Sequence, residues 1–191
     1  MKQIHKTWIS PKIKICSSPI QGKGMFAISD INKDETLIIW GDCYTDKAGA
    51  LFAQQQGKGI MQWDEYIFSY EISGNNDYYS INHSCDPNCW MSDAFTLIAR
   101  RIIKSEDEIT ADYALWETDE DFISSWKCNC GSELCRGQIT GNDWKNIELQ
   151  QRYKGHFSPL INKWINKIGV GVKGNKITLR TIGGHKILNR S

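Results

Sequence analysis

Four cysteines have a spacing that suits a metal ion better than disulfide bonds. Residues 128–135 read C-N-C-G-S-E-L-C, so three thiols fall within eight residues. A structural zinc ion takes four soft or borderline ligands in a tetrahedron, and one short knuckle rarely supplies all four. The fourth thiol is expected from the window N-H-S-C-D-P-N-C at residues 82–89. The predicted zinc ligands are Cys85, Cys128, Cys130 and Cys135.

The window at residues 82–89 is rich in polar groups that can serve a site. Asn, Asp, Ser and Pro favour turns, because their side chains bond the nearby backbone or fix φ. We therefore expect an ordered loop here. Two further segments carry patterns of their own. Residues 21–27 read Q-G-K-G-M-F-A, a turn in which glycine lets another molecule approach the backbone, and residues 106–113 read E-D-E-I-T-A-D-Y.

Taken together, these segments resemble the SET-domain protein lysine methyltransferases that carry a post-SET zinc cluster. The resemblance pairs N-H-S-C-x-P-N with C-x-C-x4-C-R-G, and adds the G-x-G turn and the E-x-x-T-x-D-Y strand in family order. It covers roughly residues 13–137. The tail, with G-N-D-W at residues 141–144 and G-H-F-S-P at 155–159, is similar to that of small stand-alone bacterial members.

The resemblance implies a fold and an activity. The fold is mainly β, a SET fold of several small sheets with a knot-like C-terminal threading, a post-SET zinc knuckle and a short helical extension. The implied division is a SET domain at residues 13–117, a zinc-binding segment at 118–140 and a helical, basic extension at 141–191. The implied activity is methyl transfer from S-adenosylmethionine to a lysine in a protein substrate.

The resemblance also assigns roles to single residues. Tyr113 matches the catalytic tyrosine, and its hydroxyl is expected to orient the lysine amine and the methyl group. A phenol with a pKa of about 10 is a poor base at neutral pH, so we expect positioning rather than proton abstraction. Trp126 is expected to cover the adenine, with a core aromatic as the alternative. The residues expected to contact the cofactor are Lys23, Gly24, Asn82, His83 and Trp126.

The walls of the substrate channel are less well defined by the sequence. Tyr70, Tyr78 and Tyr79 are candidates, and Tyr70 and Tyr79 are taken as the predicted substrate-binding residues. Ala111 stands where many relatives carry an aromatic residue that limits the number of methyl groups added, and Leu115 replaces another common aromatic. The sequence therefore leaves the product state open between mono-, di- and trimethyl-lysine.

The elements that position these residues can be outlined from apolar periodicity and from turn residues. Strands are expected over residues 13–16, 25–28, 36–40, 66–72, 95–101 and 106–113. Helices are expected over residues 47–56, 118–126, 143–153 and 160–168. A hairpin is possible around Gly183 and Gly184.

Charge is distributed unevenly along the chain. Residues 149–191 hold nine of the 23 Lys and Arg residues and none of the 22 Asp and Glu residues. Residues 1–148 therefore hold 14 basic and 22 acidic residues, a net charge of −8. An acidic groove would attract a basic protein substrate. The alternative is a solvated surface that serves solubility.

The composition indicates the cellular compartment in which the protein is expected. It also leaves two alternative functions open. The cysteine spacing favours a reducing compartment, and neither a signal peptide nor a run of about 20 apolar residues is visible, so we expect a cytoplasmic protein without membrane contact. One alternative function is a catalytically silent SET-like module that binds peptides. The other is a zinc-containing protein that binds nucleic acid through its basic tail.

Overall fold

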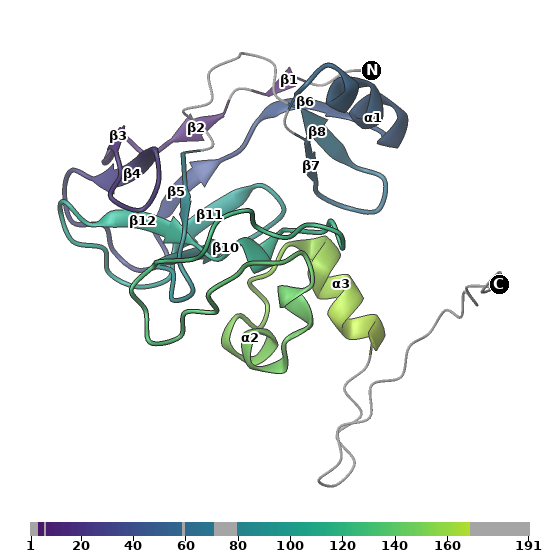
Figure 1. Ribbon diagram of the computed structural model, residues 1–191. Helices are drawn as coiled ribbons and strands as arrows, with labels where there is room; N and C mark the ends of the chain where they lie inside the picture. The colour runs from purple at the N-terminus through teal and green to yellow at the C-terminus, as the bar shows by residue number, and fades with distance from the viewer. Residues whose placement is uncertain (1–3, 6, 59, 71–79, 169–191) are drawn as a thin grey trace, which may run out of the picture.

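Three small four-stranded sheets form the framework of the computed structural model, which describes residues 4–5, 7–58, 60–70 and 80–168 (Figure 1). The first has the order β1 (Ile4–His5), β6 (Asp42–Thr45), β8 (Phe68–Tyr70), β7 (Ile60–Gln62). The second has the order β10 (Cys89–Met91), β11 (Thr96–Ala99), β5 (Thr36–Ile39), β2 (Trp8–Ile9). The third has the order β3 (Ile13–Ser17), β4 (Lys23–Ala27), β12 (Glu108–Ala111), β9 (Asn82–His83).

The core lies between these sheets and follows from the strand patterns. In β11 the burial alternates with period two, and Leu97 and Ala99 are fully buried. Its neighbour β5 is rich in β-branched and apolar residues, which pack well on a pleated surface, and Leu37 and Ile38 are also fully buried. These residues join one large apolar cluster that includes strands of the third sheet.

The third sheet carries most of the segments predicted to serve the site. Strands β3 and β4 pair antiparallel from Ile13↔Ala27 to Ser17↔Lys23 around the Gly-rich loop. Strand β12 pairs antiparallel with β4, and parallel with the two-residue strand β9. The Gly-rich loop, the window at residues 82–89 and the start of the segment after β12 therefore lie together.

The helices are few and short. Helix α1 (Lys47–Gln55) starts at Asp46, whose side chain accepts from the Gly49 backbone N–H at 2.9 Å. Helices α2 (Ile147–Arg152) and α3 (Pro159–Ile168) follow the last sheet strands (Figure 1). Among the described residues no helix has the length and apolar character needed to cross a membrane.

The C-terminal helices belong to the main core rather than forming an appendage. The extension contributes Trp144, Leu149, Tyr153, Phe157 and Ile161 to the large apolar cluster. Its backbone is also tied to the sheets, since Ser158 N–H donates to Leu115 C=O at 2.7 Å and Met91 N–H donates to His156 C=O at 3.3 Å. The extension therefore folds together with the strands that it covers.

The mainly β fold of several small sheets is confirmed, while the knot-like threading stays a prediction. The helices predicted at residues 47–56 and 160–168 are also present. The helix predicted at residues 118–126 is wrong, because these residues form turns and one isolated bridge, Ile123↔Thr140. Polar side chains there bond the backbone locally: Glu117 accepts from Thr118 N–H and Asp119 N–H, each at 2.9 Å.

The helix predicted at residues 143–153 is divided in two. Residues Asp143–Lys145 form a short 3-10 helix, and α2 begins after Asn146. Asn146 has an extended backbone, and its side chain caps α2 by accepting from Glu148 N–H at 2.8 Å. The part of the predicted strand 66–72 after Tyr70 and the hairpin near Gly183 lie outside the described residues.

Candidate active site and metal centre

Strand β9 brings two of the predicted cofactor residues to the edge of the third sheet. In its parallel pairing with β12, Asn82 lies opposite Thr110 and His83 lies opposite Ala111. Ser84 N–H donates to Ala111 C=O at 3.0 Å, so the backbone groups of His83 point away from β12. An edge strand presents unpaired N–H and C=O groups on its outer side. His83 therefore offers one backbone donor and one backbone acceptor.

A cavity of about 340 Å³ lies beside this strand edge, within the size range of ligand pockets. Five residues that the sequence analysis predicted for a site line it: Asn82, His83, Tyr113, Trp126 and the predicted zinc ligand Cys128. The sequence did not single out the other lining residues, which come from the Gly-rich loop and the zinc-binding segment. These are Ile20, Gln21, Lys127 and Asn129.

Asn82 fastens the Gly-rich loop to the cavity wall. Its Nδ2 lies 3.2 Å from Gln21 C=O, 3.0 Å from Lys23 C=O and 2.7 Å from Glu108 Oε1. With the amide nitrogen held in this way, the amide oxygen is the group left to meet a ligand, and no described residue donates to it. A small polar side chain thus joins three segments that lie far apart in the sequence.

The two glycines of this loop are needed for different reasons. Gly22 has a φ of +52°, a conformation that favours glycine. At Gly24, a Cβ atom would meet Glu108 Oε1 and Ser18 Cβ. Gly24 therefore leaves room for the Glu108 carboxylate, which accepts from Ser18 Oγ at 2.8 Å. In the described chain neither Lys23 nor Gly24 lines the cavity, so their predicted cofactor contacts stay predictions.

His83 serves as a scaffold between Tyr113 and the cysteine cluster. Its side chain is buried, and burial lowers its pKa to about 4, so the ring is neutral at pH 7. The Tyr113 backbone N–H donates to Nδ1 at 3.3 Å, which leaves the ring proton on Nε2. Nε2 lies 3.2 Å from Cys85 Sγ and can donate to it.

Tyr113 lines the cavity together with His83 and Trp126. Its hydroxyl donates to Ile81 C=O at 3.0 Å, and its ring lies 5.2 Å from that of His83 and 6.5 Å from that of Trp126, centroid to centroid. Burial raises the pKa of Tyr113 to about 12. The phenol therefore stays protonated at neutral pH, as expected for a group that positions a reactant.

The four predicted zinc ligands lie together although Cys85 is 43 residues before Cys128. All four sulfur atoms fall within 4.8 Å of one another, and Cys85 Sγ lies 3.9 Å from Cys128 Sγ. A tetrahedron with zinc–sulfur bonds of about 2.3 Å places its sulfurs about 3.8 Å apart. None of the seven cysteines forms a disulfide bond. The donor set therefore fits a zinc ion.

Other groups around this cluster favour a bound cation. Without a metal, burial raises the pKa of Cys85 to about 11, so a neighbouring cation is needed to keep this thiol ionised at pH 7. Backbone donors already point at the sulfurs: Arg136 N–H donates to Cys85 Sγ at 3.3 Å, and Cys85 N–H donates to Cys130 Sγ at 3.5 Å.

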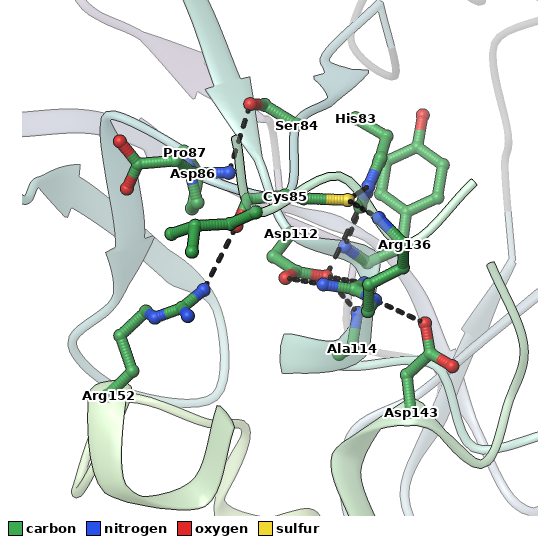
Figure 2. Close-up of polar contacts among 12 residues, drawn as sticks. His83, Ser84, Cys85, Asp86, Pro87, Asp112, Ala114, Arg136, Asp143 and Arg152 are labelled. Carbon is green, nitrogen blue, oxygen red and sulfur yellow. Dashed lines mark hydrogen bonds and ion pairs between the residues drawn. The ribbon is translucent and has the colours of Figure 1, made fainter. Parts of the chain in front are cut away.

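A buried ion pair links the zinc-binding segment to the residue before Tyr113. Figure 2 shows Arg136 between two carboxylates, those of Asp112 and Asp143. Both guanidinium amino groups donate to Asp112 at 2.7 Å, and Nε donates to Asp143 at 2.9 Å. Asp112 is fully buried and also accepts from Ala114 N–H at 3.0 Å. The sequence did not reveal this pairing, because 24 residues separate Asp112 from Arg136.

The two predicted substrate-channel residues, Tyr70 and Tyr79, stay predictions. Tyr79 lies outside the described residues. Tyr70 lines a separate cavity of about 120 Å³ beside α1 and has the Lys58 amine 4.9 Å from its ring centroid. A further aromatic neighbour of Tyr113 is Trp116, with ring centroids 5.8 Å apart, and the Trp116 ring in turn lies 5.6 Å from that of Trp40.

Comparison with known proteins agrees with this geometry. The family model described as the SET domain matches residues 22–114. Histone-lysine N-methyltransferase set-2 of Caenorhabditis elegans is 28% identical over 144 residues, which cover 66% of this chain and 9% of that protein. Histone-lysine N-methyltransferase ASHR3 of Arabidopsis thaliana is 29% identical over 143 residues, which cover 67% of this chain and 28% of that protein.

A human relative shows the same partial overlap. Histone-lysine N-methyltransferase 2B of Homo sapiens is 30% identical over 142 residues, which cover 65% of this chain and 5% of that protein. The chain therefore spans less than a third of the length of each of these three relatives. The similarity concerns one domain of much longer proteins.

Proposed function

Because residues 22–114 place this chain in the SET-domain family, we propose that it transfers a methyl group from S-adenosylmethionine to the side-chain amine of a lysine in a protein substrate. The observation that carries the proposal is that Asn82, His83 and Tyr113 line one cavity. The cavity combines polar groups on the edge of β9 with the aromatic rings of Tyr113 and Trp126. This arrangement suits a polar cofactor beside an apolar channel.

The residues of the cavity fit the cofactor group by group. The Asn82 amide oxygen can accept from the ammonium of the amino acid end. The His83 backbone N–H and C=O, which face away from β12, can bond the edge of an adenine ring. Trp126 offers an aromatic face for the same ring. When bound, S-adenosylmethionine supplies an electrophilic methyl group attached to a sulfonium sulfur.

The protein's contribution to the reaction is mainly positioning. A neutral lysine amine must lie in line with the methyl carbon at about 3–3.5 Å. A free lysine has a pKa of about 10.4, and an apolar environment lowers it by disfavouring the ammonium form. Trp116 and Trp40 extend the aromatic environment from Tyr113. The protonated Tyr113 hydroxyl accepts from the amine and orients its lone pair.

The four cysteines are proposed to hold one structural zinc ion. With Cys85 in the loop after β9 and the other three in residues 128–135, the ion would fix the zinc-binding segment beside the cavity that Trp126 and Cys128 line. The basic substrate is proposed from charge, since residues 1–148 carry a net charge of −8.

The proposal is tested by adding the purified chain and isotopically labelled S-adenosylmethionine to a cell lysate. We expect label on lysine side chains, located by mass spectrometry of the digested proteins. Asn82→Ala serves as the matched variant and should lower labelling by weakening cofactor binding. Binding of the cofactor without any labelled lysine would contradict the enzyme proposal and favour the silent peptide-binding module.

A further inference from the structure

Tyr153 lies outside residues 22–114, yet its side chain contacts two residues that support the site, Asp112 and Cys85. It follows the last residue of α2, is fully buried, and places its hydroxyl 3.1 Å from Asp112 Oδ2 and 3.4 Å from Cys85 C=O. The preceding residue, Arg152, donates to Cys85 C=O at 3.1 Å, as Figure 2 shows. Two consecutive residues of the extension therefore contact the residue before Tyr113 and a predicted zinc ligand.

The Tyr153 hydroxyl has one proton and faces two acceptors. The Asp112 oxygen is closer and charged, and hydrogen bonds to ionised acceptors are the stronger ones. The Cys85 carbonyl already receives a hydrogen bond from Arg152. A tyrosine hydroxyl has an ordinary pKa of about 10, so it is a donor at neutral pH. The structure therefore favours Asp112 as the acceptor.

Asp112 connects Tyr153 to the short helix that begins at Tyr113. Its Oδ1 accepts from Ala114 N–H and from Arg136, and its Oδ2 accepts from Arg136 and Tyr153. The Ala114 contact caps the 3-10 helix Tyr113–Leu115, and Asp112 Oδ1 lies 3.8 Å from His83 Nδ1. A change at Asp112 therefore reaches both the backbone of Tyr113 and the ring that supports it.

We infer that Tyr153 is a positioning residue of the proposed methyl transfer. Its hydroxyl holds Asp112, and through Asp112 it fixes Tyr113 and Arg136. The Arg136 backbone N–H in turn donates to the sulfur of the first predicted zinc ligand, Cys85. The C-terminal extension is on this account part of the active site, supplied from outside the segment that the family model matches. The expected effect of Tyr153 on methyl transfer rests on the proposed function. The expected effect on metal retention by the four cysteines does not.

The test is Tyr153→Phe in the full-length chain, which removes the hydroxyl and keeps the ring in the core. Changes in groups that support metal ligands typically cost about 10- to 100-fold in activity or metal affinity. We expect kcat for methyl transfer to fall by about 10-fold or more, with KM for both substrates within about twofold. We also expect zinc to pass to a chromogenic chelator about 10-fold faster.

Tyr44→Phe is the matched control. It removes the same hydroxyl from a half-buried tyrosine that donates to Trp40 C=O at 3.1 Å, in the first sheet. We expect its kcat and its rate of zinc loss to equal those of the wild type. Arg152→Gln is the second variant, used if Tyr153→Phe fails to fold, and it should raise the rate of zinc loss because Cys85 C=O loses its donor.

A lower melting temperature of Tyr153→Phe with kcat and zinc loss unchanged would overturn the inference and leave Tyr153 as a core residue only. A wild-type chain that transfers no methyl group would instead contradict the proposed function. In that case the rate of zinc loss still decides the inference, since zinc and the chelator are the only probes required. Equal rates in Tyr153→Phe and the wild type would then refute it.

Discussion

The third sheet and the first sheet differ in which side chains are buried and which are exposed to solvent. Around the third sheet, polar residues such as Asn82, His83 and Asp112 are buried, and each is paired across a long sequence distance. Around the first sheet, apolar residues stay exposed, with Phe52 at 66% and Tyr66 at 80% exposure. Buried polar groups must be paired to be tolerated, so the third sheet tolerates few substitutions. The first sheet should tolerate many.

The largest expected effect is the loss of a predicted zinc ligand. Cys128→Ser leaves three thiolates for the metal, and metal binding is coupled to folding of a segment this short. We expect the zinc content to fall by about tenfold or more and the unfolding transition to broaden or disappear. Metal analysis and circular dichroism provide the measurement. Cys16→Ser, at an exposed cysteine on β3, should leave both unchanged.

The second effect concerns the buried ion pair. Arg136→Met removes the partner of a carboxylate that is fully buried, and breaking a buried pair in this way costs about 3–5 kcal/mol. Chemical denaturation should show a loss of this size. The exposed pair between Lys104 and Asp30 gives the control, because Lys104→Ala should produce no measurable change. Similar losses in both variants would contradict the comparison between buried and exposed charges.

A smaller effect is expected at the Gly-rich loop. In Gly24→Ala the added methyl group meets Glu108 Oε1 and Ser18 Cβ, which should cost about 1–3 kcal/mol of unfolding free energy. Because Glu108 also holds Asn82, the affinity for S-adenosylmethionine should fall as well. Calorimetric titration measures that affinity. Full affinity together with full stability would show that the loop does not depend on this close approach.

The smallest effect is expected on α1. Phe52 is exposed, so Phe52→Ser should change the unfolding free energy by less than about 0.5 kcal/mol. It should also leave the affinity for S-adenosylmethionine unchanged, since Phe52 lines the separate cavity beside Tyr70. Denaturation and titration together check this. A loss of more than about 1 kcal/mol of unfolding free energy would contradict the expectation that the first sheet tolerates more substitutions than the third.

The same contrast explains what could be predicted from the sequence. The four cysteines and the residues Asn82, His83 and Tyr113 come from motifs whose spacing reflects one fixed arrangement. The structure places the four thiols together and brings Asn82, His83, Tyr113 and Cys128 to one cavity. The aromatic neighbours of Tyr113 are different. Trp116 belongs to no motif, and the predicted Tyr70 lies at another cavity, because side-chain packing in the first sheet leaves no short-range pattern.

Two further features could not be predicted from the sequence. One reflects side chains that compete with helix formation for backbone groups, and the other is a contact between residues far apart in the chain. The helix predicted at residues 118–126 gives way to side-chain bonds, such as Ser124 Oγ donating to Trp126 C=O at 2.8 Å, that no periodicity reveals. The contact between Tyr153 and Asp112 spans 41 residues and joins two elements that were predicted separately. Only the folded chain shows that the extension and the site share one network.

The most direct test of the central claim compares binding and turnover in Tyr113→Phe. The account holds that the cavity binds S-adenosylmethionine and that the Tyr113 hydroxyl positions the lysine amine. Calorimetric titration should give a Kd within about twofold of the wild type, whereas kcat should fall by about 100-fold, since misplacing a reactant by about 1 Å has an effect of this size. An unchanged kcat with normal binding would contradict the role of Tyr113 in the reaction.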